Sequence, residues 1–169
     1  MNNYERIFFK KNIRKIGLVN VTTGITPGAE RYEGYIRALR KKKIKPEERF
    51  IKISGFDAED SMRKAEELLT AADRPTAILS ISNRVTIGAL KAIERLGLKI
   101  PDDISVIGFD DLKTAELLSP PLTVVTQPAY EFGRVGINTL LKKIDGQKLK
   151  NKTIKLQPEL VIRKSCRRV

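Results

Sequence analysis

The chain alternates short runs of β-branched residues with longer segments that carry apolar residues at helical spacing. Between residues 29 and 41, Tyr32, Tyr35 and Leu39 follow the i, i+3, i+7 pattern of an amphipathic helix. A repeated alternation of strands and helices is typical of βαβ units around a parallel sheet. The sequence therefore predicts an α/β fold. The expected strands lie at 15–21, 50–53, 77–81 and 104–109, and a helix follows each of the first three.

The regular alternation ends after residue 110, near the segment Ser119-Pro120-Pro121. We expect a strand at 123–127, a helix at 129–144 and two strand-like pieces at 153–156 and 159–162. The helix at 129–144 is rich in large apolar residues and needs a surface to cover. We therefore expect it to belong to a second layer or subdomain.

The residue types of common catalytic and metal sites are scarce. The chain has no histidine, which is the commonest general base near neutral pH and the commonest zinc ligand. Cys166 lies among arginines in the C-terminal tail, and the phosphate-loop, dinucleotide and hydrolase motifs are absent. Asp110 and Asp111 are adjacent, so at a strand end they point in different directions. We expect a binding protein and not an enzyme, with no cofactor and no metal.

The formal charge is +13, from 33 Lys and Arg against 20 Asp and Glu, and such a balance suggests nucleic-acid binding. The basic clusters at 10–15, 40–45 and 163–168 lack the interleaved aromatics that stack on bases. Solvated helix ends and tails explain them more simply. A membrane span needs about 18 consecutive apolar residues, and no such run occurs. The basic N-terminus is unlike a signal peptide, so we expect a cytoplasmic protein with no membrane partner.

Ligands of parallel α/β sheets collect at the carboxyl ends of the strands. Arginine donors and Asp or Asn acceptors at those ends suit the vicinal hydroxyls of a polyhydroxyl ligand. Each residue also has a structural explanation. Asn83 can cap a helix, Asp110 or Asp111 can begin a turn, and Arg31 can pair with a nearby glutamate. The polar residues that follow the expected strands are Thr22, Thr23, Ser54, Ser82, Asn83, Asp110 and Asp111, with Arg31 across the first loop.

One long stretch resembles a known family. Residues 74–133 contain RPTAI, IGAL, GLKIPDDISVIGFDD and SPPLTVVTQP, and the similarity extends more loosely through IRKIGLV, GAERYEGYIRAL and ELVIRKS. These motifs resemble the effector-binding domain of LacI/GalR transcriptional regulators. The resemblance covers nearly the whole chain.

The resemblance implies a three-layer α/β/α fold with a mostly parallel sheet, of the periplasmic-binding-protein-like type I. In that fold two similar subdomains clamp a small effector. Residues 12–122 and 153–165 would form the C-terminal subdomain, and residues 123–150 would be an element of the N-terminal subdomain. Residues 1–169 would then be a fragment of the effector-binding domain without the DNA-binding head.

The resemblance also implies effector contacts. Arg31 stands where the family has an arginine that contacts the effector, and Asp110 stands at the aspartate of GFDD that accepts from effector hydroxyls. Ser82 and Asn83 occupy the place where the family usually has Asn-Asp. Asn83 therefore offers a neutral amide where a carboxylate is common.

The function implied by the resemblance is effector sensing in a homodimeric repressor that reaches operator DNA through its head. The effector would be a small molecule, a sugar or a related metabolite. The alternative is a sugar-binding solute receptor of a transporter, which shares the fold. Family members dimerise through the C-terminal subdomain, and the residues expected at that interface are Arg84, Leu112, Leu117 and Leu118.

Overall fold

The computed structural model describes residues 13–111, 114–148 and 153–167. These residues form one six-stranded sheet in the order β2-β1-β3-β4-β5-β6. Strands β1 to β5 pair in parallel with their neighbours, and β6 is antiparallel to β5. The elements are β1 (Ile16–Val21), α2 (Thr26–Lys41), a short 3-10 helix (Glu48–Phe50), β2 (Ile51–Ser54), α3 (Ala58–Leu69), β3 (Ala77–Ser80), α4 (Asn83–Arg95), β4 (Ser105–Phe109), β5 (Thr123–Thr126), α5 (Ala129–Ile144) and β6 (Glu159–Val161).

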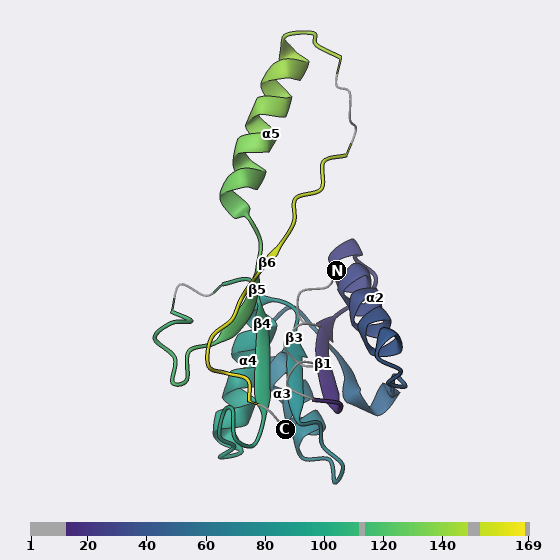
Figure 1. Ribbon diagram of the computed structural model, residues 1–169, viewed down its shortest axis with the longest axis vertical. Helices are drawn as coiled ribbons and strands as arrows, with labels where there is room; N and C mark the ends of the chain where they lie inside the picture. Colours follow the sequence, from purple (N-terminus) through teal and green to yellow (C-terminus); the bar gives the residue numbers. More distant parts are fainter. Residues whose placement is uncertain (1–12, 112–113, 149–152, 168–169) are drawn as a thin grey trace.

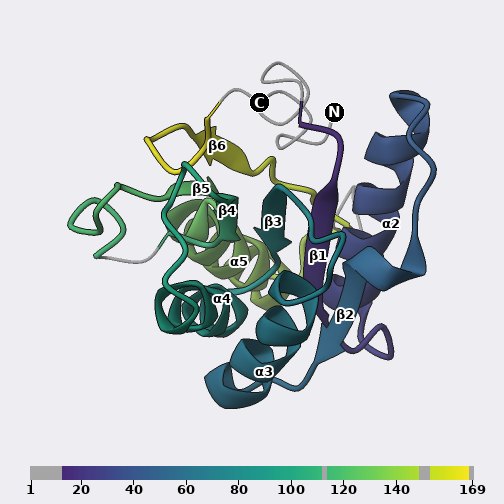
Figure 2. The ribbon, with the colours of Figure 1, turned by 90° about the horizontal axis from the view of Figure 1, so that it is seen from below.

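Helices cover both faces of the sheet, as the three-layer prediction requires. Helices α3 and α4 lie side by side on one face, and α2 lies on the other (Figures 1 and 2). Strand β1 pairs with β2 on one side and β3 on the other. The chain therefore adds β2 on one side of β1 and then crosses to the other side, where it adds β3 and the remaining strands. The strand order reverses between β1 and β3, which is where open α/β sheets bind their ligands.

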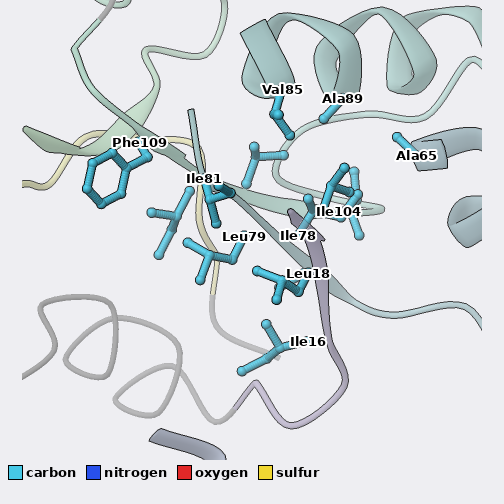
Figure 3. Packing of buried hydrophobic residues seen from close by; sticks show 14 of the residues in the cluster. Ile16, Leu18, Ala65, Ile78, Leu79, Ile81, Val85, Ala89, Ile104 and Phe109 are labelled. Atoms are coloured by element: carbon cyan, nitrogen blue, oxygen red, sulfur yellow. The ribbon is translucent and has the colours of Figure 1, made fainter. Parts of the chain in front are cut away.

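The core is formed by the central strands, which are buried along their whole length in β1, β3 and β4. Leu18, Ile78 and Ile107 are almost fully enclosed, and Figure 3 shows Leu18 and Ile78 among the packed side chains. Each buried aliphatic side chain contributes about 1.5–3 kcal/mol relative to an exposed one. Strands covered on both faces read as continuous apolar runs, and for this reason the sequence pattern located them.

Helices α3 and α4 pack closely because a glycine stands at their contact. A Cβ added at Gly88 would lie 2.5 Å from the carbonyl oxygen of Ala58 and 2.6 Å from the Cβ of Ser61. Asp57 caps α3 as predicted, with its Oδ1 accepting from the backbone N–H of Asp60 at 2.7 Å. The cap predicted for α4 is wrong by one residue. Ser82 is the N-cap, accepting from the N–H of Val85, and Asn83 is the first helical residue.

The last third of the chain leaves the sheet and returns to it. Helix α5 projects away from the sheet (Figure 1), and none of its residues is buried. Strand β5 pairs with β4 in the sheet, and the chain leaves the sheet for α5 after Thr126. On the return, the described residues 153–158 form no strand, and only β6 pairs with β5. Within the described ranges, no helix is long and apolar enough to cross a membrane.

Candidate effector-binding site

A cavity of about 680 Å³ opens beside the carboxyl ends of β4 and β5 and the first turns of α2. It lies at the end of the sheet that the topology favours for a ligand. Arg31, Phe109 and Gln127 contribute the side chains with clear roles there. The other lining residues are Thr26, Pro27, Ala29, Glu30, Glu33, Arg37, Val125, Lys155, Gln157 and Pro158.

Arg31 spans the place where the strand order reverses. It starts from α2, which follows β1, and its Nη1 donates to the carbonyl oxygen of Ile81, just after β3, at 2.7 Å. Its guanidinium carbon lies 3.8 Å from the centre of the Phe109 ring at the end of β4. Stacking on an aromatic face orients the guanidinium and keeps its donors in one plane. These two contacts differ from the surface ion pair with a nearby glutamate that the sequence also allowed for Arg31.

Asp110 begins a tight turn directly after β4. Its φ of 64° is left-handed, a conformation that Asp tolerates better than most residues. Its backbone N–H donates to the carbonyl oxygen of Val125 at 2.7 Å, and its Oδ1 accepts from the Nε2 of Gln127 at 2.6 Å. Asp110 therefore combines two roles that the sequence offered as alternatives, a turn residue and a candidate ligand. It forms a turn, and it presents a carboxylate bonded to a residue of the cavity wall.

Ser82 and Asn83 are not among the residues that line this cavity. The Ser82 side chain caps α4, and its carbonyl oxygen accepts from the Thr86 hydroxyl at 2.8 Å. The Oδ1 of Asn83 is buried and has no hydrogen-bond partner among the described residues. A buried acceptor without a partner costs free energy. Because its amide oxygen has no partner in the described part of the chain, Asn83 remains a candidate for contact with an effector, although it does not line the cavity.

Three residues of this region were not selected from the sequence. Phe109 and Gln127 line the cavity, and Asn20 lies fully buried in β1 with its Nδ2 donating 3.1 Å to the carbonyl oxygen of Gly28. The Oδ1 of Asn20 has no partner among the described residues. A signal for Asn20 was present, because an amide inside the apolar run KIGLVNV is unusual for a strand buried on both faces. Phe109 and Gln127 could be selected only from the pairing of β4 with β5.

Asp111 points away from Asp110 and forms an ion pair with Arg163. The Nη1 and Nη2 of Arg163 donate to the two carboxylate oxygens of Asp111 at 3.1 and 2.9 Å, and Nη2 also donates to Glu116 at 3.2 Å. The bonds to Asp111 raise the pKa of the Arg163 guanidinium above its ordinary value. Only 12% of the Arg163 side chain is exposed. The turn after β4 is therefore held by a charge-assisted, bidentate contact.

A second cavity, of about 550 Å³, lies at the opposite end of the sheet. Its walls come from α4 and from the segments that precede β4 and β5, including Leu98 and Leu118. Among the residues expected at the dimer interface, Arg84 is exposed, Leu117 is 83% exposed and Leu118 is half-buried. Leu112 lies outside the described residues. No group of three His, Cys, Asp or Glu side chains that could hold a metal ion occurs in the described part of the chain.

Comparison with known proteins adds to this geometry. The periplasmic binding protein-like domain family matches residues 6–166. The ribose operon repressor of Haemophilus influenzae is 38% identical over 152 residues, which are 90% of this chain and 46% of that protein. The chain thus spans about half the length of the curated relatives that it matches.

Solved structures of transcriptional regulators are also similar to this chain. A LacI-family regulatory protein from Chloroflexus aggregans is 32% identical with a TM-score of 0.89, over 96% of this chain and 58% of that one. The CelR transcriptional regulator in complex with cellobiose is 27% identical with a TM-score of 0.88, over 96% of this chain and 50% of that one. A Lac repressor dimer bound to operator and an anti-inducer is 25% identical with a TM-score of 0.85, over 97% and 59%. The chain therefore belongs to the periplasmic-binding-protein-like domain family and is an effector-binding domain of the LacI/GalR type.

Proposed function

We propose that this chain senses a sugar or a related polyhydroxyl metabolite for a transcriptional repressor. One observation carries the proposal. Arg31 is stacked on Phe109 in the cavity at the strand-order reversal, and Gln127, which lines the same cavity, donates a hydrogen bond to the Asp110 carboxylate. A fixed guanidinium supplies paired donors, and a carboxylate accepts from hydroxyls. The cellobiose complex of the CelR regulator supports a carbohydrate as the effector class.

The proposed mechanism is a shift between conformations. An effector that binds one arrangement of two subdomains more tightly than another shifts the population toward the first by its difference in affinity. We propose that 12–122 and 153–165 form the C-terminal subdomain. Helix α5, within the proposed 123–150 element, would belong to the N-terminal subdomain. The exposure of α5 supports this division, because its apolar residues need a covering surface.

We further propose that the protein acts as a cytoplasmic homodimer on operator DNA. The similarity to a Lac repressor dimer bound to operator supports both partners, and the curated relatives are repressors and not transport receptors. Arg84, Leu112, Leu117 and Leu118 are the proposed interface residues. The exposed Leu117 supports their placement at a protein contact.

The experiment that tests the site is a thermal-shift titration of the full chain with D-ribose and with cellobiose. We expect a rise in melting temperature for at least one of the two, because a ligand that binds only the folded state stabilises it. Arg31→Met and Asp110→Asn should remove the rise, since each deletes one proposed contact while keeping side-chain size.

Lys91→Met is the matched control, because Lys91 is exposed on α4. It should shift as the wild type does. An equal rise in all four proteins would show that the site is misassigned. No rise with either sugar in the wild type would contradict the proposed effector class.

A further inference from the structure

Asn20 is a fully buried amide near the carboxyl end of β1. A strand covered on both faces normally carries apolar residues, because a buried polar group costs free energy unless it is hydrogen-bonded. Only half of this amide is hydrogen-bonded within the described residues. Its Nδ2 donates to the Gly28 carbonyl oxygen at 3.1 Å, and its Oδ1 has no partner there. The packing of the core alone does not explain an amide at this position.

The Asn20–Gly28 bond attaches the first turn of α2 to β1. A Cβ added at Gly28 would lie 2.2 Å from the Thr22 carbonyl oxygen, so this turn lies directly against the end of the strand. Further along α2, the Tyr35 hydroxyl donates to the Ile16 carbonyl oxygen at 2.7 Å. The same helix and strand are thus joined at two heights, and the two bonds together fix how far α2 lies along β1.

Arg31 lies between these two points on one face of α2. Gly28, Arg31 and Tyr35 follow the i, i+3, i+7 spacing of residues that share a helix face. The Nη1 of Arg31 donates to the Ile81 carbonyl oxygen at 2.7 Å, and its guanidinium carbon lies 3.8 Å from the centre of the Phe109 ring. A movement of the first turn of α2 therefore moves the guanidinium relative to both partners.

Asn20 and Phe109 also share a face of the sheet. Leu18 pairs in register with Leu79, and Leu79 with Ile107. Residues two apart along a strand point to the same face. Asn20 and Phe109 each stand two residues beyond a member of this row, so they lie at the same level of the sheet. The bond at Asn20 and the stacking at Phe109 are therefore neighbouring contacts of α2.

Replacing the Asn20 amide should change stability little. Gly28 lies inside α2, where its carbonyl oxygen also accepts from the helical N–H four residues later, so this oxygen keeps a partner without Asn20. An apolar side chain of similar size would also remove the buried Oδ1, which has no partner in the described ranges. The lost hydrogen bond and the removed acceptor have opposite effects on stability. The main consequence of the amide is thus geometric.

We propose that Asn20 is a positioning residue for the effector site. Its bond to Gly28 sets where α2 begins on the sheet and thereby sets where the Arg31 guanidinium lies above Phe109. Because Asn20 is fully buried, it acts through Arg31 and does not touch an effector. The effect on effector affinity rests on the proposed function, whereas the effect on the position of Arg31 does not.

Side-chain NMR of Arg31 in the full chain, without ligand, tests the positioning. The ring current of Phe109 shifts the resonance of the Arg31 Nε–H group, and Phe109→Leu gives its value without the ring. In Asn20→Leu, which removes the amide donor at similar size, the signal should move at least halfway toward that value. Asn20→Val should move it in the same direction, and its β-branched side chain suits a buried strand if Asn20→Leu does not fold. An unmoved Arg31 signal in these variants would overturn the proposal.

Ser80→Ala is the matched control. Ser80 is also fully buried in the sheet, but its hydroxyl bonds to that of Thr86 in α4 at 2.8 Å, on the face opposite α2. This variant should keep the wild-type Arg31 signal. An equal movement of the signal in Ser80→Ala would show that a general loosening of the sheet causes the shift, and it would overturn the role of Asn20.

A second arm measures the affinity for D-ribose and cellobiose by calorimetry. A displaced Arg31 loses about one hydrogen bond to the ligand, so a sugar that binds the wild type should bind Asn20→Leu about tenfold more weakly. Its affinity for Ser80→Ala should be unchanged. Equal affinities of the wild type and Asn20→Leu would overturn the role of Asn20 in effector binding. Failure of both sugars to bind the wild type would contradict the proposed effector class, while the NMR arm would still decide for or against the positioning of Arg31.

Discussion

Gly88 sets how closely α3 and α4 approach. A methyl group there would lie 2.5 Å from the Ala58 carbonyl oxygen and 2.7 Å from the Met62 nitrogen, and both are backbone atoms that cannot rotate away. Overpacking of a closely packed contact costs about 1–3 kcal/mol. Gly88→Ala should therefore lower the free energy of unfolding by that amount in chemical denaturation.

Gly133→Ala is the control for this prediction. Gly133 also lies inside a helix, but a Cβ there meets nothing within 4 Å. Helix propensity then dominates, so the change should be neutral or stabilising by about 0.5–1 kcal/mol. The same change in unfolding free energy for the two substitutions would contradict the role of the α3–α4 contact at Gly88.

Tyr35 gives the fold a dependence on alkaline pH. Its hydroxyl donates to the Ile16 carbonyl oxygen at 2.7 Å, and burial, followed by the nearby Tyr32 and Glu47, raises the pKa of the phenol well above its ordinary value. Above about pH 10 the unfolded chain loses this proton while the folded chain keeps it, so the free energy of unfolding falls as the pH rises. Below that pH both states are protonated and the effect disappears.

Tyr35→Phe should separate the two effects in urea titrations over a pH series. At pH 7 the variant should lose about 1 kcal/mol with the hydrogen bond. Above about pH 10 its stability should fall less steeply than that of the wild type. Parallel curves for the two proteins throughout the alkaline range would contradict the role given to Tyr35.

The sequence predicted the position of single residues unevenly. Arg31 and Asp110 could be selected because polar residues after strands share one edge of a parallel sheet. Phe109 under Arg31 and Gln127 on Asp110 depend on which strands are neighbours and in what register, as β4 and β5 are. A one-dimensional pattern does not contain that information, so half of the candidate site emerged only from the structure.

At the scale of elements, N-caps fix where helices begin. Asp57 accepts from the Asp60 N–H at 2.7 Å, which satisfies one of the unpaired donors at the start of α3. Asp57→Ala should cost about 1 kcal/mol of unfolding free energy, whereas Asp57→Ser should keep most of it. Equal losses in the two variants, measured by urea denaturation, would show that the cap does not stabilise α3.

The elements themselves were largely predictable, and the exceptions have physical causes. The buried strands are continuous apolar runs, and α5 has the predicted bounds. The cap of α4 falls on Ser82 and not Asn83, because both residue types cap well and only the backbone path separates them. The predicted strand at 153–156 does not form, since a short strand needs a neighbour to pair with and α5 carries this segment away from the sheet (Figure 1).

At the scale of the whole molecule, the net charge of +13 suggests nucleic-acid binding, but charge alone does not distinguish a nucleic-acid interface from solvated helix ends and tails. The features that support effector sensing are local: the reversal of strand order at β1 and β3, the cavity beside it, and the stacked Arg31 and Phe109 in that cavity. A second cavity at the opposite end of the sheet offers a competing location for a small molecule. The location of sugar binding therefore distinguishes a site at the carboxyl ends of the strands from a site in the opposite cavity.

Chemical-shift mapping by heteronuclear NMR on the isotope-labelled full chain, titrated with D-ribose and with cellobiose, tests the central claim most directly. We predict that the backbone amide signals that move will be those of Arg31, Phe109, Asp110 and Gln127, at the carboxyl ends of the strands. Movement confined to Leu98, Ile100 and Leu118, around the opposite cavity, or no movement with either sugar, would contradict it.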